Sequence, residues 1–91
     1  MMEQEIHIAG VVVYTQPAQL ESIKSCIAEV PYAEIHAEDP HGKLIVTLET
    51  EGTKRTLDTM DAMRALPGVL DVVLVYQHTE PVSALDQEVS Q

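Results

Sequence analysis

The sequence predicts an α+β domain in which two helices pack on one face of a four-stranded antiparallel sheet. Two runs rich in Val and Ile, residues 6–14 and 69–76, are apolar at nearly every position, which predicts strands with two apolar faces. Between them lie two segments with apolar residues at helical spacing and two shorter strand-like segments joined by a turn. The order is therefore strand, helix, strand, strand, helix, strand.

The first strand, residues 6–14, ends shortly before Pro17, which fits the first turn of a helix because its missing N–H needs no partner there. A helix should follow and end at Pro31. Cys26 flanks its apolar side, and we expect this cysteine to be a small core residue. The apolar stripe consists of Leu20, Ile23, Ile27 and Val30.

The middle of the chain predicts a hairpin. Residues 33–38 alternate between small or apolar and polar side chains, as in an edge strand with one wet face. Residues 39–42, Asp-Pro-His-Gly, have the composition of a turn, and residues 43–49 form the next strand.

A second helix begins near Gly52 and ends at Pro67-Gly68, before the last strand at residues 69–76. Its expected apolar side consists of Leu57, Met60, Met63 and Leu66. The acidic residues that follow predict a solvated tail. We therefore divide the chain into an N-terminal extension at 1–5, one domain at 6–78 and an acidic, disordered tail at 79–91.

This order of elements is the ferredoxin-like βαββαβ arrangement. With right-handed crossovers its strands take the spatial order 4-1-3-2, and both helices lie on one face. The other face of the sheet stays uncovered.

Alternation along each strand then predicts which side chains face outward. We take Asp71 and His7 to point away from the helices, which assigns the other residues by parity. In the first and last strands, at residues 6–14 and 69–76, the side chains expected to face the core are Ile6, Ile8, Val12, Leu70, Val72, Leu74 and Tyr76. Val69 is expected to face outward. The outward, candidate binding residues are Ala9, Val11, Val13, Glu34, His36, Ile45, Thr47, Glu49, Asp71, Val73 and Val75.

Composition narrows the function classes. Fifteen Asp and Glu against five Lys and Arg give a net charge of -10, which disfavours nucleic acid and favours a cationic partner. The single cysteine cannot form an internal disulfide, and no apolar run is long enough for a membrane span or a secretory signal. We expect a cytoplasmic protein.

Catalytic and metal-binding patterns are not found. The four histidines are scattered without a second ligand at metal-site spacing, and no glycine-rich phosphate loop occurs. Cys26 has no histidine near it in the sequence that could activate it. We therefore expect no enzyme, no cofactor and no metal.

Two interpretations of the uncovered face remain open from the residues alone. It could close a homodimer, as in a regulatory or ligand-binding module of this fold, or it could bind a foreign segment. The carboxylates at its margins would meet their own copies across a twofold axis, which argues against self-association.

Several short aliphatic motifs, at their joint spacing over residues 6–78, resemble the NapD family. They are Ile8-Ala9-Gly10-Val11-Val12-Val13 with Ser22-Ile23, His41-Gly42-Lys43-Leu44-Ile45-Val46, and Leu66-Pro67-Gly68-Val69-Leu70 with Leu74-Val75-Tyr76.

The resemblance implies a small cytoplasmic chaperone of the periplasmic nitrate reductase catalytic subunit. Such a chaperone binds the twin-arginine signal peptide of the reductase precursor and holds back export until the molybdenum cofactor has been inserted. The resemblance also implies that the peptide binds as a helix across the open sheet face. From the parity assignment, we expect the two arginines to meet Glu34, Glu49 or Asp71 and the chaperone to be a monomer. The apolar stretch would meet Ala9, Val11, Ile45, Val73 and Val75.

Overall fold

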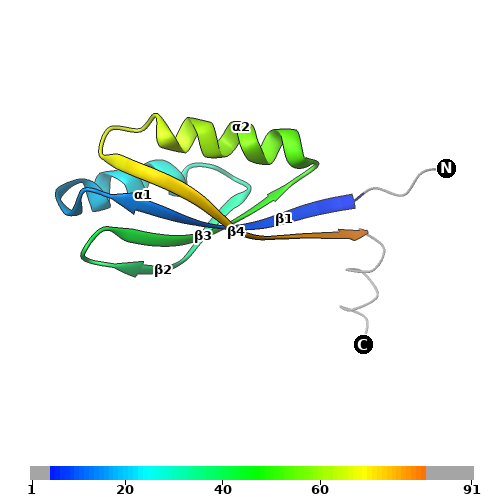
Figure 1. Ribbon diagram of the computed structural model, residues 1–91, viewed down its shortest axis with the longest axis horizontal. Helices are drawn as coiled ribbons and strands as arrows, with labels where there is room; N and C mark the ends of the chain where they lie inside the picture. Colours follow the sequence, from blue (N-terminus) through cyan, green and yellow to red (C-terminus); the bar gives the residue numbers. More distant parts are fainter. Residues whose placement is uncertain (1–4, 82–91) are drawn as a thin grey trace.

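The computed structural model describes residues 5–81, and its elements follow the expected order (Figure 1). The elements are β1 (Glu5–Thr15), a 3-10 turn (Pro17–Gln19), α1 (Leu20–Ala28), β2 (Ala33–Asp39), β3 (Lys43–Thr50), α2 (Thr53–Arg64) and β4 (Val69–Pro81).

The four strands form one antiparallel sheet in the spatial order β2-β3-β1-β4. Both helices lie on the same side of this sheet, and the other side is uncovered (Figure 1). The ferredoxin-like βαββαβ prediction is therefore confirmed, including the strand order.

Two glycines with positive φ allow the turns that close the sheet at one end. Gly42, at φ 112°, ends the hairpin turn, where its N–H donates to the Asp39 carbonyl at 2.9 Å and its own carbonyl accepts from Thr15 N at 2.8 Å. Gly68, at φ 93°, precedes β4, and its carbonyl accepts from Gln16 N at 2.8 Å. Both conformations favour glycine because a Cβ would be strained there. The end of β1 is thus tied to both turns.

The core between sheet and helices is aliphatic with two methionines. It consists of Ala9, Val11, Val13, Leu20, Ile23, Ile27, Leu44, Val46, Leu48, Met60, Met63 and Val72.

Two expectations about the helices are wrong. Cys26 on α1 is exposed and not in the core. Leu57 on α2 is 49% exposed, because this helix buries positions 56, 59, 60 and 63, at i, i+3, i+4 and i+7, instead of every third residue. Buried threonines therefore replace Leu57. Their hydroxyl groups have partners: Thr56 with Thr50 at 2.7 Å, and Thr59 with the Arg55 carbonyl at 2.7 Å.

The predicted orientation of β1 is also wrong. Ala9, Val11 and Val13 were expected on the open face, but they are 1%, 0% and 0% exposed and lie in the core. One end of β1 projects beyond the helices (Figure 1). His7 lies near this end of the strand and is only partly buried on the helix side, so its polarity does not mark the outward face. The alternate residues therefore lie on the other face of the sheet, among them Val12, which is 9% exposed between its neighbours on β3 and β4.

Strand β4 departs from simple alternation because it contains two register shifts. Thr15 pairs with Val69 and Tyr14 with Asp71, which leaves Leu70 as an extra residue, and Val75 is left over in the same way between Leu74 and Tyr76. Leu70 and Tyr76, both predicted in the core, are consequently exposed, whereas Val69 packs against the core instead of facing outward. The placements of Val72 and Leu74 in the core are confirmed.

The last strand is longer than expected. It continues to Pro81, pairing Glu80 with Ile6 and Pro81 with Glu5, so residues 79–81 belong to the sheet and not to a tail, and Glu5 belongs to β1. The remaining parts of the predicted extension and tail, residues 1–4 and 82–91, lie outside the described residues.

A matched pair of leucines tests these placements. Leu48→Ala should lower the free energy of unfolding by about 2 to 5 kcal/mol, because the substitution leaves a cavity in the core. Leu70→Ala removes the same atoms from a side chain that is 62% exposed, and should cost about 0.5 kcal/mol or less. Urea unfolding followed by circular dichroism measures both, and equal costs would contradict the two placements.

Candidate functional site

The uncovered side of the sheet is the candidate site, and the strand register defines it. Directly paired residues share a face, so the partners of outward residues also point outward. We call this surface the open face. Its central rows are Ala37, Ile45, Val12 and Val73, then Glu34, Thr47, Gly10 and Tyr76, then Glu49, Ile8 and His78.

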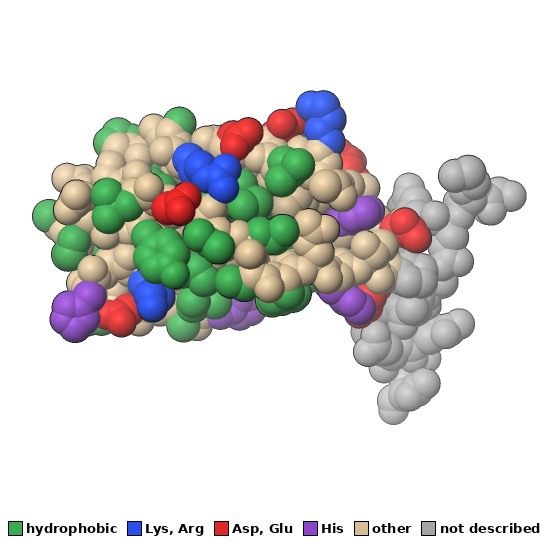
Figure 2. Space-filling model, in the orientation of Figure 1, with side chains coloured by type: hydrophobic (Ala, Val, Ile, Leu, Met, Phe, Trp, Pro, Cys, Tyr) green, Lys and Arg blue, Asp and Glu red, His purple; other side chains and the backbone are tan. Residues whose placement is uncertain are grey.

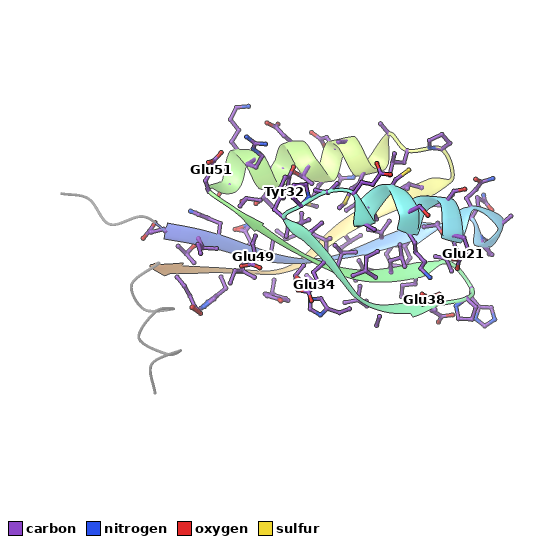
Figure 3. All side chains as sticks on the ribbon, turned by 180° about the vertical axis from the view of Figure 1, so that it is seen from behind. Glu21, Tyr32, Glu34, Glu38, Glu49 and Glu51 are labelled. Atoms are coloured by element: carbon purple, nitrogen blue, oxygen red, sulfur yellow. The ribbon has the colours of Figure 1, made fainter. Side chains whose placement is uncertain are left out.

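The structure brings together part of the predicted set. Ile45, Thr47, Glu49 and Val73 lie on the open face as expected, and Val73 is 39% exposed. Glu34 is paired with Thr47, and Figure 3 shows it on the side away from the helices. The pairing of His36 is interrupted by a register shift, but its Nε2 lies 2.7 Å from Thr47 Oγ1. Val75 is exposed as the extra residue of a bulge.

Sequence reasoning missed several residues of this face, including the four residues Ile8, Val12, Tyr14 and Tyr76. Ile8, Val12 and Tyr14 are alternate residues of β1 and lie on the same face as Gly10, which has no side chain to indicate its orientation. Tyr14 was the available signal, because a tyrosine with a polar tip suits a half-exposed position better than the core. Tyr14 is 38% exposed.

Tyr76 lies across Gly10. A Cβ added to Gly10 would overlap the ring, so the absence of a side chain there is what lets the ring lie close to β1. Tyr76 remains 50% exposed. The open face thus has an aromatic surface at its middle row, between the apolar residues around Val12 and the polar residues around Glu49.

Hydrophobic side chains are concentrated on the open face and along its β4 edge. Figure 2 shows green side chains gathered along β4 and the strands below it. The large exposed apolar residues on β1 and β4 are Tyr14, Leu70, Val73, Val75 and Tyr76. Several exposed apolar side chains on two paired strands of a small domain indicate a binding surface.

One end of the open face is acidic. Glu34, Glu49 and Glu80 lie there, and within residues 5–81 no Lys or Arg comes within 4 Å of any of them. Among residues 5–81, the basic side chains near two of these glutamates are histidines: His36 Nε2 lies 3.9 Å from Glu34 Oε1, and His78 Nε2 lies 2.7 Å from Glu80 Oε1. Glu80 Oε2 is buried and accepts no hydrogen bond from the described residues.

The carboxylates at the opposite end already have partners. The backbone N–H of His41 donates to Asp39 Oδ1 at 2.9 Å, which, with the weaker contribution of the His41 ring, lowers the Asp39 pKa below its ordinary value. Asp71 was predicted to be available to a ligand, but its Oδ1 accepts from Val72 N at 2.8 Å and lies 3.6 Å from Arg64 Nε. Lys43 adds a positive charge beside the Tyr14 ring.

The helix side has a hollow of about 560 Å³ between α1 and α2. Cys26, Val30 and Leu66 contribute to its apolar lining, and charged residues at its border pair with one another, as in Lys54 with Asp58 at 3.0 Å. Nearby, hydrogen bonds from the Lys24 ammonium to Glu38 and then to Glu21 raise the Lys24 pKa and link α1 to β2. These carboxylates thus have lysine partners, in contrast to those at the acidic end of the open face.

Among residues 5–81, no group of three or more His, Cys, Asp or Glu side chains is placed to hold a metal ion. Neither α1 nor α2 is long and apolar enough to cross a bilayer.

A family model described as NapD protein matches residues 6–81. The chain belongs to the NapD family. It is 30% identical to Chaperone NapD of Escherichia coli K12 over 80 residues, which covers 87% of this chain and 92% of that protein. It is 27% identical to Chaperone NapD of Haemophilus influenzae over 75 residues, 81% of each chain.

The fold of this chain is also similar to that of a solved NapD protein. The solution structure of the E. coli Tat proofreading chaperone protein NapD matches with a TM-score of 0.75 and 30% identity, covering 87% of this chain and 84% of that one.

The contact between Gly10 and Tyr76 is open to a direct test. Gly10→Ala should displace the Tyr76 ring, because the added methyl group would occupy its place, while leaving the core intact. NMR of the tyrosine ring signals would show a shift for Tyr76. Gly52→Ala is the matched control, since a Cβ there meets nothing within 4 Å, and it should leave those signals unchanged. An unmoved Tyr76 signal in Gly10→Ala would contradict the contact.

Proposed function

We propose that this chain is a cytoplasmic, monomeric chaperone that binds the twin-arginine signal peptide of the periplasmic nitrate reductase catalytic subunit precursor. Binding withholds the peptide from the export machinery until the cofactor has been inserted. Membership of the NapD family and the likeness to a Tat proofreading chaperone support this role. The role requires binding and release, and no covalent chemistry.

The observation that carries the proposal is the open face itself. Val73 and Tyr76 are 39% and 50% exposed there, next to Val12 and Ile45 in the centre of the sheet. Covering a few hundred Å² of apolar surface is worth several kcal/mol at about 25 cal/mol per Å², before the costs of association. A helical peptide laid across the sheet would cover this surface with its own apolar side.

The peptide chemistry fits both properties of the face. A twin-arginine signal peptide has two arginines followed by an apolar stretch. The apolar stretch would pack on the residues around Val12, and the guanidinium groups would pair with carboxylates that have no Lys or Arg partner within residues 5–81. Nucleic acid has a negatively charged backbone, which these carboxylates would repel.

The same face is the one through which a dimer would form. Self-association would bring Glu34, Glu49 and Glu80 of one copy towards the open face of the other, where like charges meet at an interface. We therefore propose a monomer. Sedimentation of the purified protein decides between the two, because a tight dimer through the sheets would leave no surface for the peptide.

Isothermal titration calorimetry with a synthetic signal peptide tests the binding surface. Val73→Glu should weaken binding about tenfold or more, because it places an unpaired charge under the apolar stretch. Leu57→Glu makes the same change at a position that is 49% exposed on α2, and should leave the affinity unchanged. Equal affinity of Val73→Glu and the parent protein would contradict the proposal. Circular dichroism of both variants controls for folding.

Salt dependence tests the charge contribution. Raising the ionic strength from about 0.05 to about 0.5 M should weaken binding about two- to fivefold, since exposed ion pairs are screened and contribute little each. A peptide with both arginines replaced by glutamine should bind more weakly and with little salt dependence. Identical salt dependence for the two peptides would exclude pairing of the arginines with the face.

A further inference from the structure

The open face differs chemically between its two ends, and we infer from this the direction of the bound peptide. Its two arginines lie at the end with Glu49 and Glu34, and its apolar stretch runs towards Tyr14, parallel to β1. The inference rests on the proposed function, because it assumes that the open face binds a twin-arginine peptide.

The acidic end is suited to guanidinium groups. Glu49 and Glu34 are exposed, and they belong to neighbouring rows of paired residues on β3 and β2. Figure 3 shows both nearer to the projecting ends of β1 and β4 than Glu38 is. Glu80 lies further along β4 and adds negative charge to this end, with Oε2 buried and Oε1 beside His78. An arginine entering here gains charged acceptors without displacing another cation.

The opposite end disfavours arginine. Its row contains Lys43, which lies over the Tyr14 ring at 5.8 Å from the ring centre and would repel a second cation. Its two carboxylates, Asp39 and Asp71, already accept hydrogen bonds from backbone N–H groups of this chain. A guanidinium would therefore have to compete with existing contacts, whereas an apolar segment would meet Val12, Val73 and the Tyr14 ring.

Tyr76 lies at the boundary between the two parts. Its row separates the row of Glu49 from the row of Val12, and Gly10 holds the ring close to the sheet. A guanidinium stacked on an exposed tyrosine ring gains a cation–π contact of about 0.5 to 1 kcal/mol. An arginine paired with Glu49 would be close to this ring. The apolar stretch would begin just beyond it.

The length of the face agrees with this arrangement. From Ile8 to Tyr14 is six residues of β1, or about 20 Å at a rise of about 3.3 Å per residue. A helix of about 13 residues spans the same distance at about 1.5 Å per residue. A peptide with its apolar stretch directly after the arginines thus covers the row of Glu49 and reaches the row of Tyr14.

Paramagnetic NMR measures the direction with two matched reporters. Ile8 and Ile45 both lie on the open face, Ile8 opposite Glu49 and Ile45 opposite Val12. The probe is a synthetic peptide of two arginines followed by about 12 Leu and Ala residues. It carries a nitroxide at either its N-terminus or its C-terminus. The N-terminal label should broaden the Ile8 methyl signals more, and the C-terminal label those of Ile45; the reverse pattern overturns the inference.

Charge variants provide an independent measurement. Glu49→Lys should raise the Kd of the unlabelled probe about tenfold, because it replaces attraction by repulsion. Glu29→Lys, the same change at the end of α1, should alter it less than about twofold at physiological ionic strength. Lys43→Glu should not weaken the parent affinity by more than about twofold. If Glu49→Lys has no effect while Lys43→Glu tightens binding several-fold, the arginines lie at the other end.

The outcomes separate this inference from the proposed function. A reversed nitroxide pattern, with Val73→Glu still weakening binding, overturns the direction and leaves signal-peptide binding in place. Absence of any binding by the parent protein, with folding intact by circular dichroism, overturns both.

Discussion

Strand β1 is the element on which the rest of the structure depends, because it pairs with β3 on one side and β4 on the other. Side chains along a strand alternate, so burying Ala9, Val11 and Val13 under the helices forces Val12 and Tyr14 onto the opposite face. The core and the open face are therefore two results of one register. A slip of one residue would exchange them.

Strand β4 pairs with β1 along its whole length but has two extra residues, Leu70 and Val75, each of which forms a bulge. If β4 had no bulge at Val75, Tyr76 would continue the alternation and point towards the helices, since it is an odd number of residues from Val73. With the bulge, Val73 and Tyr76 lie on the same face. The contact then needs one more feature, a residue without a side chain opposite Tyr76, and Gly10 supplies it. The aromatic surface of the open face thus depends on a backbone irregularity and a glycine together.

The sequence predicts the element order, the strand order and the uncovered face, because these follow from turn residues and hydrophobic spacing. On β3 it also predicts the faces, since Thr47 and Glu49 alternate with buried aliphatic residues. On β1 both faces are apolar, and His7, the marker from which the faces are assigned, lies near the projecting end, where it is only partly buried on the helix side. On β4 parity fails at Leu70 and Val75, because aliphatic residues at a bulge look like any other strand residues in the sequence.

The acidity of the chain is also distributed unevenly. Lys24, Lys54, Arg55 and Arg64 all lie on the helices and pair with carboxylates nearby, whereas Lys43 lies on the sheet at the end away from Glu49. The uncompensated charge of the open face is therefore concentrated at one end. Electrostatic attraction acts over about 8 Å at physiological ionic strength, whereas apolar contact acts only at touching distance. A peptide with a cationic end and an apolar stretch would accordingly be drawn in by its arginines first, and its apolar part would pack afterwards along the direction that β1 sets.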